Sequence, residues 1–386
     1  MGTARGKSSK KSFSKKKKKS YSEVDFPLVA VTVALVLFGL LMVYSASSYE
    51  NIVTGQQSYS DFIRQGFFAF IGLFIMVFFM TNIDYHRMTL PKTKVLLVVV
   101  LALNVAVILF DPVKGARRWL RFGGMSLQPS ELAKFTMVLL AANLLKRMEF
   151  LTAKKKWLQT FKVFVVMGIF AGIIVVLQKN LSIGAITVLT SLTLMFLSGA
   201  TFLQMTTYVL IGVSALGVLL WIEPYRVTRF LNFGDPFATA QEAGHQLVQS
   251  LFALTSGGVY GRGLGMSRLK AFWLPEAQND FIFAVVVEEL GLLGGLFLMI
   301  LLFILIFRGF RIAMEAKDSF GRLLAMGITM IFVLQSFINI AVVIGAFPVT
   351  GVTLPFISAG GTSLVVNLIA VGVLLNISRQ SRRNKY

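Results

Sequence analysis

The sequence contains no cysteine, only two histidines and few charged residues for its length. Without a thiol, the chain has no means of thiol catalysis, disulfide formation or thiolate metal binding. The two histidines, His86 and His245, do not suffice for a multi-histidine metal centre. Charged residues make up 14% of the chain, whereas an ordinary soluble domain holds about a quarter. The sequence therefore lacks the polar surface that a soluble globule of this size needs.

The sequence is rich in long apolar segments. Of the 386 residues, 56% are hydrophobic, and apolar runs recur that can each cross a bilayer core of roughly 30 Å as a helix. We predict an all-α integral membrane fold with about ten transmembrane helices. The predicted spans lie near residues 27–46, 66–81, 95–110, 131–147, 160–177, 182–200, 203–222, 281–308, 321–346 and 363–378.

Basic residues are concentrated at the start of the chain. A net charge of +21 is compatible with nucleic-acid binding, but nine of the 38 Lys and Arg precede the first apolar run, and Lys15 to Lys19 are consecutive. A Lys/Ser segment beside a membrane helix is typical of a disordered tail that contacts anionic lipid. We therefore predict a disordered basic cytoplasmic tail at residues 1–25, and no nucleic-acid partner.

The remaining charges predict the orientation. With the N-terminus in the cytoplasm, the inner segments hold 26 of the 38 Lys and Arg, in agreement with the positive-inside rule. Both termini are then cytoplasmic. Residues 26–378 form the ten-helix membrane domain, 223–280 form a large extracytoplasmic loop between spans 7 and 8, and 379–386 form a basic cytoplasmic tail.

Two outer loops carry cations against this bias. The loop 111–130 contains Lys114, Arg117, Arg118 and Arg121, and the loop 223–280 contains Arg226, Arg229, Arg262, Arg268 and Lys270. One explanation is that these long side chains reach up to lipid headgroups. The other is a binding site for an anion such as a lipid phosphate, to which Arg makes paired charge-assisted hydrogen bonds.

Among the ionisable residues within the predicted spans, where charge is costly, two pairs are informative. Glu131 and Lys134 are three residues apart on one helix face, so we expect them to pair, either at a functional cavity or as an ion pair that fixes the helix start. Glu288 and Glu289 are adjacent, and successive helical side chains diverge by about 100°. We therefore expect that the two cannot share one partner. Gly291 and Gly295 form a G-x-x-x-G motif that favours close helix packing.

Asp280 ends the long outer loop where the eighth span begins. Asp is a common helix cap, which is one interpretation of this position. The other is a carboxylate at the water–lipid boundary that accepts a proton from a hydroxyl.

Two further segments are irregular. Residues 236–264 have the pattern of an interfacial helix followed by a glycine-rich loop. Residues 347–363 are apolar but broken by Pro and Gly, and such backbone persists at membrane depth only where it is buried or lines a cavity. We predict that this second segment is a re-entrant wall of an outer cavity.

Several short motifs occur together in a specific order: Met42–Ser47, Arg118-Trp119, Gln128–Glu131 with Lys134, Tyr225-Arg226, Arg229, Asp235-Pro236, Gln246, Gln249-Ser250, Leu274–Glu276, Asp280–Phe283, Glu288–Gly291 and Pro348–Ser363. In this order and spacing they resemble the SEDS family (shape, elongation, division and sporulation), which polymerises peptidoglycan from a lipid-linked disaccharide. The amino-acid sequence at Leu274–Ala277 and Pro348–Ser363 looks more like that of the FtsW/SpoVE branch than that of the RodA branch.

The resemblance implies a peptidoglycan glycosyltransferase of the bacterial cell membrane. Such an enzyme polymerises lipid II into glycan strands at the outer leaflet during septal cell-wall synthesis, by an inverting transfer that forms a β-1,4 linkage, and Asp280 matches its catalytic aspartate. Candidate substrate or cavity contacts are Arg118, Glu131, Lys134, Arg226, Arg229, Gln246, Gln249, Ser358 and Ser363, and candidate structural or cavity residues are Glu288 and Glu289.

The resemblance also implies partners. These are lipid II, the growing lipid-linked glycan, a single-span class B penicillin-binding protein and division-site regulators. No metal ligand is assigned, and a divalent cation, Mg or Mn, stays open as a cofactor. The chain departs from the family at Lys179-Asn180-Leu181-Ser182, where Pro-Asp-Leu-Gly is usual. This departure puts in doubt any role of that aspartate in metal binding or in structure.

Two rival functions stay open. A flippase for the lipid-linked precursor also needs a cavity, outer cations and intramembrane carboxylates, but it predicts polar groups through the full depth of the membrane. A non-catalytic division scaffold needs none of these groups. Ionisable residues cluster toward the outer ends of the predicted spans, which favours the enzyme.

Overall fold

The computed structural model describes residues 24–113, 115–122, 125–223, 227, 233–234, 236–238, 244–268 and 277–382. Helices account for most of them. The α-helices are α1 (Phe26–Val53), α2 (Ser60–Asn82), α3 (Leu90–Ala106), α4 (Pro129–Leu145), α5 (Ala153–Gly172), α6 (Leu181–Leu197), α7 (Phe202–Ile222), α9 (His245–Gly257), α10 (Ile282–Glu315), α11 (Ser319–Val343) and α12 (Gly361–Arg382). A π-helical turn, Ile173–Leu177, extends α5, and two short strands, β1 (Leu120–Phe122) and β2 (Met125–Leu127), form an antiparallel hairpin.

Each predicted span has a helix at its place, which confirms the all-α membrane fold. Among the described residues, eight helices are long and apolar enough to cross a membrane. The helices α4 and α6 have 17 residues each, and α4 carries the charged Glu131 and Lys134. The number of ten spans therefore stays a prediction. The last helix, α12, continues to Arg382 and so enters the segment predicted as the C-terminal tail.

Burial separates inner from outer helices. The faces of α4, α11 and α12 are largely buried, whereas α2, α3 and α7 expose many large apolar side chains, as lipid-facing helices do. The outermost helix is α7, on which only Gln204 and Tyr208 are buried. Tyr208 attaches it to α5, because its ring stacks on Phe164 and its hydroxyl lies 3.0 Å from that of Thr160.

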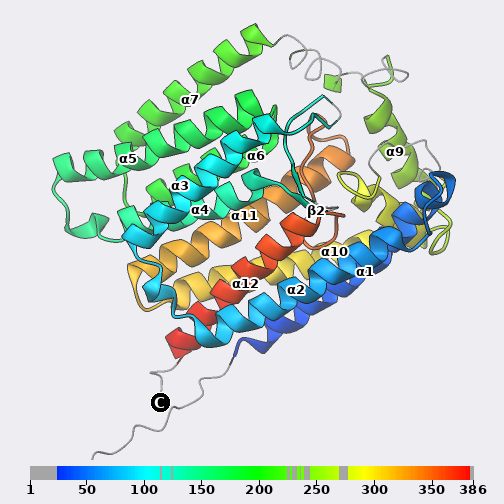
Figure 1. Cartoon of the computed structure of the whole chain (residues 1–386), viewed down its shortest axis with the longest axis horizontal. Helices are drawn as coiled ribbons and strands as arrows, with labels where there is room; N and C mark the ends of the chain where they lie inside the picture. Colours follow the sequence, from blue (N-terminus) through cyan, green and yellow to red (C-terminus); the bar gives the residue numbers. More distant parts are fainter. Residues whose placement is uncertain are drawn as a thin grey trace, which may run out of the picture.

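The helices run between two ends of one bundle (Figure 1). We name the end at which α1 begins and α12 ends the terminal end. The opposite end, with α9, the β1–β2 hairpin and the turn before α10, is the loop end.

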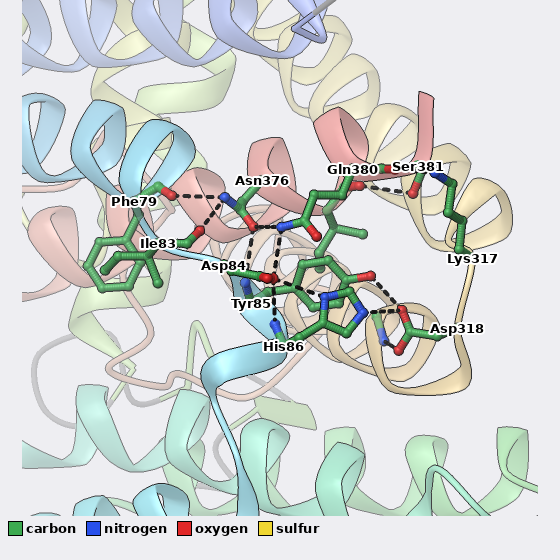
Figure 2. A network of polar contacts seen from close by, with 12 residues as sticks. Phe79, Ile83, Asp84, Tyr85, His86, Lys317, Asp318, Asn376, Gln380 and Ser381 are labelled. Carbon is green, nitrogen blue, oxygen red and sulfur yellow. Dashed lines mark hydrogen bonds and ion pairs between the residues drawn. The ribbon is translucent and has the colours of Figure 1, made fainter. Parts of the chain in front are cut away.

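Polar side chains tie the helices together at the terminal end (Figure 2). The Asn376 amide of α12 donates to the backbone carbonyls of Phe79 and Met80 near the end of α2, at 3.1 Å each. Asp84 accepts from the His86 ring at 2.9 Å and from Gln380 at 3.0 Å. Burial raises the pKa of Asp84, but the hydrogen bonds from Gln380 and His86 outweigh this effect and lower its pKa below the ordinary value.

The Tyr85 hydroxyl extends this network by donating to Asp318. Burial and the neighbouring Asp318 raise the pKa of Tyr85 above its ordinary value, so the tyrosine stays a neutral donor. Asp318 also accepts from the Gly321 amide at 3.0 Å and thereby caps α11.

A break interrupts α10 near the loop end. Gly291 has φ 72° and ψ −173°, which only glycine adopts readily, and a Cβ there would lie 2.2 Å from the Val259 carbonyl oxygen. The loop after α9 crosses this break: the Arg262 amide donates to the Glu288 carbonyl at 3.0 Å, and the Leu292 amide donates to the Gly258 carbonyl at 2.9 Å. Gly291 therefore breaks the helix and allows the backbone of the loop after α9 to approach the backbone of α10 closely. The prediction that it serves helix packing is wrong.

Candidate active site

Asp280 lies at the loop end, in the turn that leads into α10. The capping position of α10 is Phe281, so Asp280 precedes the cap instead of occupying it. The carboxylate faces Gly351, which belongs to the irregular segment between α11 and α12. A Cβ built on Gly351 would lie 3.3 Å from Asp280 Oδ2 and 3.8 Å from Arg118 Nη1. The aspartate and the arginine therefore approach the same point, from chain segments far apart in sequence.

Arg118 is held in place by backbone oxygens. Its Nε donates to the Gln178 carbonyl at 3.0 Å, and its Nη2 donates to the Lys179 carbonyl at 2.7 Å. These carbonyls are accessible because the chain leaves its π-helical turn here, with Lys179 at a positive φ of 51°. The guanidinium is thereby fixed at two corners, while Nη1 lies near Gly351.

The family departure lies beside this contact. Asn180 is buried, and its Oδ1 accepts from the Ile183 amide at 3.2 Å, so it caps α6. Asn caps helices as well as Asp does. The capping role is therefore filled without a charge at this position.

The irregular segment between α11 and α12 contacts the turn that carries Asp280. That it forms a re-entrant wall of an outer cavity stays a prediction. Its Ala359 amide donates to the Gln278 carbonyl at 2.9 Å. On the other side, Gln65 of α2 donates to the Ser358 carbonyl at 3.2 Å and accepts from the Gly360 amide at 3.1 Å. Three backbone groups of this irregular segment are thus paired, two of them with the Gln65 side chain, and such pairing is a condition for burial in a membrane.

A residue that the sequence analysis missed connects this segment to Asp280. Asn339 of α11 is 1% exposed, and its Nδ2 donates to the carbonyls of Asp280 and Val352, at 2.7 Å each. No sequence motif marks such a residue, because its partners are backbone oxygens. A buried Asn on an apolar helix that faces a broken segment was the available signal.

Glu131 and Lys134 form the expected ion pair in the first turns of α4. Lys134 Nζ lies 2.9 Å from Glu131 Oε2, and both side chains are at most 2% exposed. Whether they line a cavity beneath Asp280 stays a prediction.

Glu288 and Glu289 share a partner, contrary to the expectation. The hydroxyl of Ser267 donates to Glu288, and the Ser267 amide donates to Glu289 at 3.3 Å. The reason is that the loop after α9 packs directly on α10. The hydroxyl and the amide of Ser267 therefore each reach one of the two adjacent glutamates. Ser45 of α1 also donates to Glu289, at 2.6 Å. The two carboxylates therefore hold the inserted loop.

The remaining candidates are distributed differently. Gln246 and Gln249 lie half-buried on α9, which is anchored to α11 by a 2.8 Å hydrogen bond from Ser250 to the Val343 carbonyl. The hydroxyl of Ser358 accepts from the Leu354 amide at 2.8 Å, and that of Ser363 accepts weakly from Asn367 at 3.5 Å. Arg226 and Arg229 lie outside the described residues. A role of these six residues toward a substrate stays a prediction.

Solved structures of related fold cover nearly the whole chain. The structure described as "Structural coordination of polymerization and crosslinking by a peptidoglycan synthase complex" matches with a TM-score of 0.73 and 24% identity, over 94% of this chain and 99% of that chain. The rod shape determining protein RodA of Thermus thermophilus matches with a TM-score of 0.68 and 23% identity, over 94% and 98%. At these identities the likeness establishes the fold.

Curated relatives are more similar in sequence. Stage V sporulation protein E of Bacillus subtilis is 41% identical over 365 residues, which cover 93% of this chain and 98% of the relative. A probable peptidoglycan glycosyltransferase FtsW of Geobacter metallireducens is 37% identical over 370 residues, 94% of this chain and 97% of the relative. The family described as "Cell cycle protein", FtsW/RodA/SpoVE, matches residues 26–383. The chain therefore belongs to the FtsW/RodA/SpoVE family, as the resemblance of its motifs implied.

Proposed function

We propose that this protein is a peptidoglycan glycosyltransferase that polymerises lipid II into glycan strands. The observation that carries the proposal is the approach of the Asp280 carboxylate and the Arg118 guanidinium to one point beside Gly351. A base and a cation near one point are what a transfer from a diphosphate donor needs. The FtsW relatives bear the name of this activity.

The reaction follows from these two groups. Asp280 takes the proton from the 4-hydroxyl of the acceptor GlcNAc, and the hydroxyl oxygen attacks the anomeric carbon of the donor. The bond from that carbon to the diphosphate oxygen breaks, and the lipid diphosphate leaves with the electron pair. Arg118 stabilises the charge that develops on the leaving group, a task suited to a planar guanidinium. A single displacement on an α-linked donor inverts it to the β-1,4 product.

A divalent cation has no protein cage among the described residues. In that part of the chain no group of three His, Cys, Asp or Glu residues lies together. The position at which the family usually has an aspartate is Asn180, and its side chain caps a helix. We therefore assign no step to Mg or Mn.

In this proposal the terminal end of the bundle is cytoplasmic and the loop end is outside. The active site at the loop end therefore takes its precursor from the outer leaflet. The charge count of the inner segments supports this orientation. In this Cys-free chain, Ala240→Cys in the outer loop should react with an impermeant thiol reagent in intact cells, and Ser14→Cys in the basic tail should not. Labelling of Ser14→Cys with protection of Ala240→Cys would invert the orientation.

The partner is a single-span class B penicillin-binding protein, a transpeptidase that crosslinks the new strands, together with division-site regulators. The solved complex of similar fold is described as coordinating polymerization with crosslinking. The role in septal synthesis rests on the similarity to FtsW, and the relative of Bacillus subtilis is named for sporulation.

One reconstitution separates the enzyme from its rivals. The purified protein in vesicles receives labelled lipid II in the leaflet that faces the loop end, and the glycan products are sized on a gel. Long strands are expected. Movement of lipid II across the bilayer without polymerisation would identify a flippase. Neither activity, with the transpeptidase partner present, would leave a scaffold.

A further inference from the structure

We propose that Asn339 is a positioning residue for glycosyl transfer, which holds the turn that carries Asp280 against the segment that carries Gly351. This proposal rests on the proposed function, in which Asp280 is the base. Asn339 itself touches only backbone, since its Nδ2 donates to the carbonyls of Asp280 and Val352.

The two carbonyls belong to segments without regular structure. Asp280 lies in the turn before α10, and Val352 lies in the irregular segment between α11 and α12. An amide nitrogen has two hydrogens to donate, and here each is used at 2.7 Å. One side chain on a regular helix therefore joins the turn that carries Asp280 to the segment that carries Gly351. Such support from a rigid element is what holds a reacting group to a narrow geometry.

The position of the Val352 carbonyl matters for the site because Gly351 is the preceding residue. Gly351 is the residue beside both Asp280 Oδ2 and Arg118 Nη1, and at 3.3 Å even a methyl group would crowd the carboxylate. Fixing the Val352 carbonyl restrains the neighbouring Gly351 backbone, which lies near both the Asp280 carboxylate and the Arg118 guanidinium. Without the clamp, the Ala359–Gln278 hydrogen bond would still join the segment to the turn, but the backbone at Asp280 and Val352 would lose its restraint, and the carboxylate could shift beside Gly351.

Asn376 of α12, at the terminal end of the bundle, provides a control. Its Nδ2 donates to the carbonyls of Phe79, Met80 and Ile83, and its Oδ1 accepts from Tyr85 and Gln380, so it makes more hydrogen bonds than Asn339 does. Both asparagines are nearly buried, at 1% and 6% exposure. If Asn339 served stability alone, its substitution would lower kcat per folded molecule no more than the same substitution of Asn376 does.

The experiment compares Asn339→Leu with Asn376→Leu in the full-length protein in vesicles, with labelled lipid II as the probe. Both variants should melt at a lower temperature. Per folded molecule, Asn339→Leu should lose about a hundredfold in kcat, the loss expected from a displacement of about 1 Å. Its KM for lipid II should stay within about twofold, because no substrate contact is removed. Asn376→Leu should keep kcat within about threefold of the parent.

Asn339→Asp provides a second variant of nearly unchanged volume, in which an acceptor replaces the donor, and the same fall in kcat is expected. Equal kcat values for the Asn339 and Asn376 variants would overturn the proposal. A rise in KM at unchanged kcat would do so too, since it would make Asn339 a substrate contact. Asp280→Asn distinguishes failure of the positioning role from failure of the proposed function. If Asp280→Asn is inactive while Asn339→Leu and Asn339→Asp keep the parental kcat, only the positioning role of Asn339 fails. If Asp280→Asn is itself parental, both proposals fail.

Discussion

The two ends of the bundle differ in the solvent exposure of their charged side chains. At the terminal end, Asp84, His86 and Asp318 pair at the ends of regular helices, and their side chains are between 34% and 50% exposed. At the loop end, Glu131 and Lys134 pair at no more than 2% exposure, and Glu288 and Glu289 are similarly buried against an inserted loop. Among the described residues of the terminal end, the Asp25–Arg308 pair is a buried exception.

This difference indicates where function lies. Exposed pairs contribute little to stability and are readily exchanged, whereas buried charges carry a desolvation penalty that apolar residues avoid. The terminal end uses polar groups to fasten helices. The loop end retains costly groups around irregular backbone, which is typical of a site that does chemistry. Substitutions at the two ends should therefore separate stability from activity.

Lys134→Ala should have the largest effect on stability. It leaves the Glu131 carboxylate unpaired in a site without solvent, so we expect a loss of about 3–5 kcal/mol. The double variant Glu131→Gln/Lys134→Met removes both charges and should recover most of this loss. Thermal melts beside glycan synthesis measure both effects.

The double variant also sharpens the role of the pair. Restored stability without restored synthesis would make the pair part of the reaction. If Lys134→Ala alone folds and polymerises like the parent, the pair is needed neither for structure nor for catalysis.

Gly351→Ala should act on activity far more than on stability. The new methyl group would lie 3.3 Å from Asp280 Oδ2, so the carboxylate must move, and we expect a fall in kcat of about tenfold. Gly360→Ala in the same segment is the control, because its Cβ would meet the nearest atom, Ser363 Cβ, at an ordinary 3.7 Å. Equal rates for the two variants would show that Gly351 does not set the position of the base.

Asp84→Asn should have the smallest effect. The folded protein lowers the pKa of Asp84, so this group stabilises the fold above its ordinary pKa, and the contribution is lost as the pH falls through the lowered value. Because the side chain is nearly half exposed, we expect less than about 1 kcal/mol. Melts of parent and variant between neutral and acid pH should converge in acid. A constant difference down to the lowest pH would contradict this account.

Sequence patterns predicted what depends on composition and short spacing. Hydropathy located the helices, and the spacing of three residues predicted the Glu131–Lys134 pair, since both depend on local geometry alone. The interpretation of Gly291 was wrong because a glycine that breaks a helix and one that packs a helix look alike in sequence. The Asn339 clamp was not predictable, since it joins a side chain to carbonyls 59 and 13 residues away.

The measurement that tests the account most directly compares Asp280→Asn with Asp318→Ala, by glycan length on a gel and by thermal melt. Asp280→Asn keeps the size of the side chain but cannot take a proton, so synthesis should fall by about two orders of magnitude or more at a nearly unchanged melting temperature. Asp318→Ala removes the cap of α11 and should lower stability by about 1 kcal/mol while the rate per folded molecule stays near parental. Long strands made by Asp280→Asn at a near-parental rate would contradict the account and turn the search for the base to Glu131.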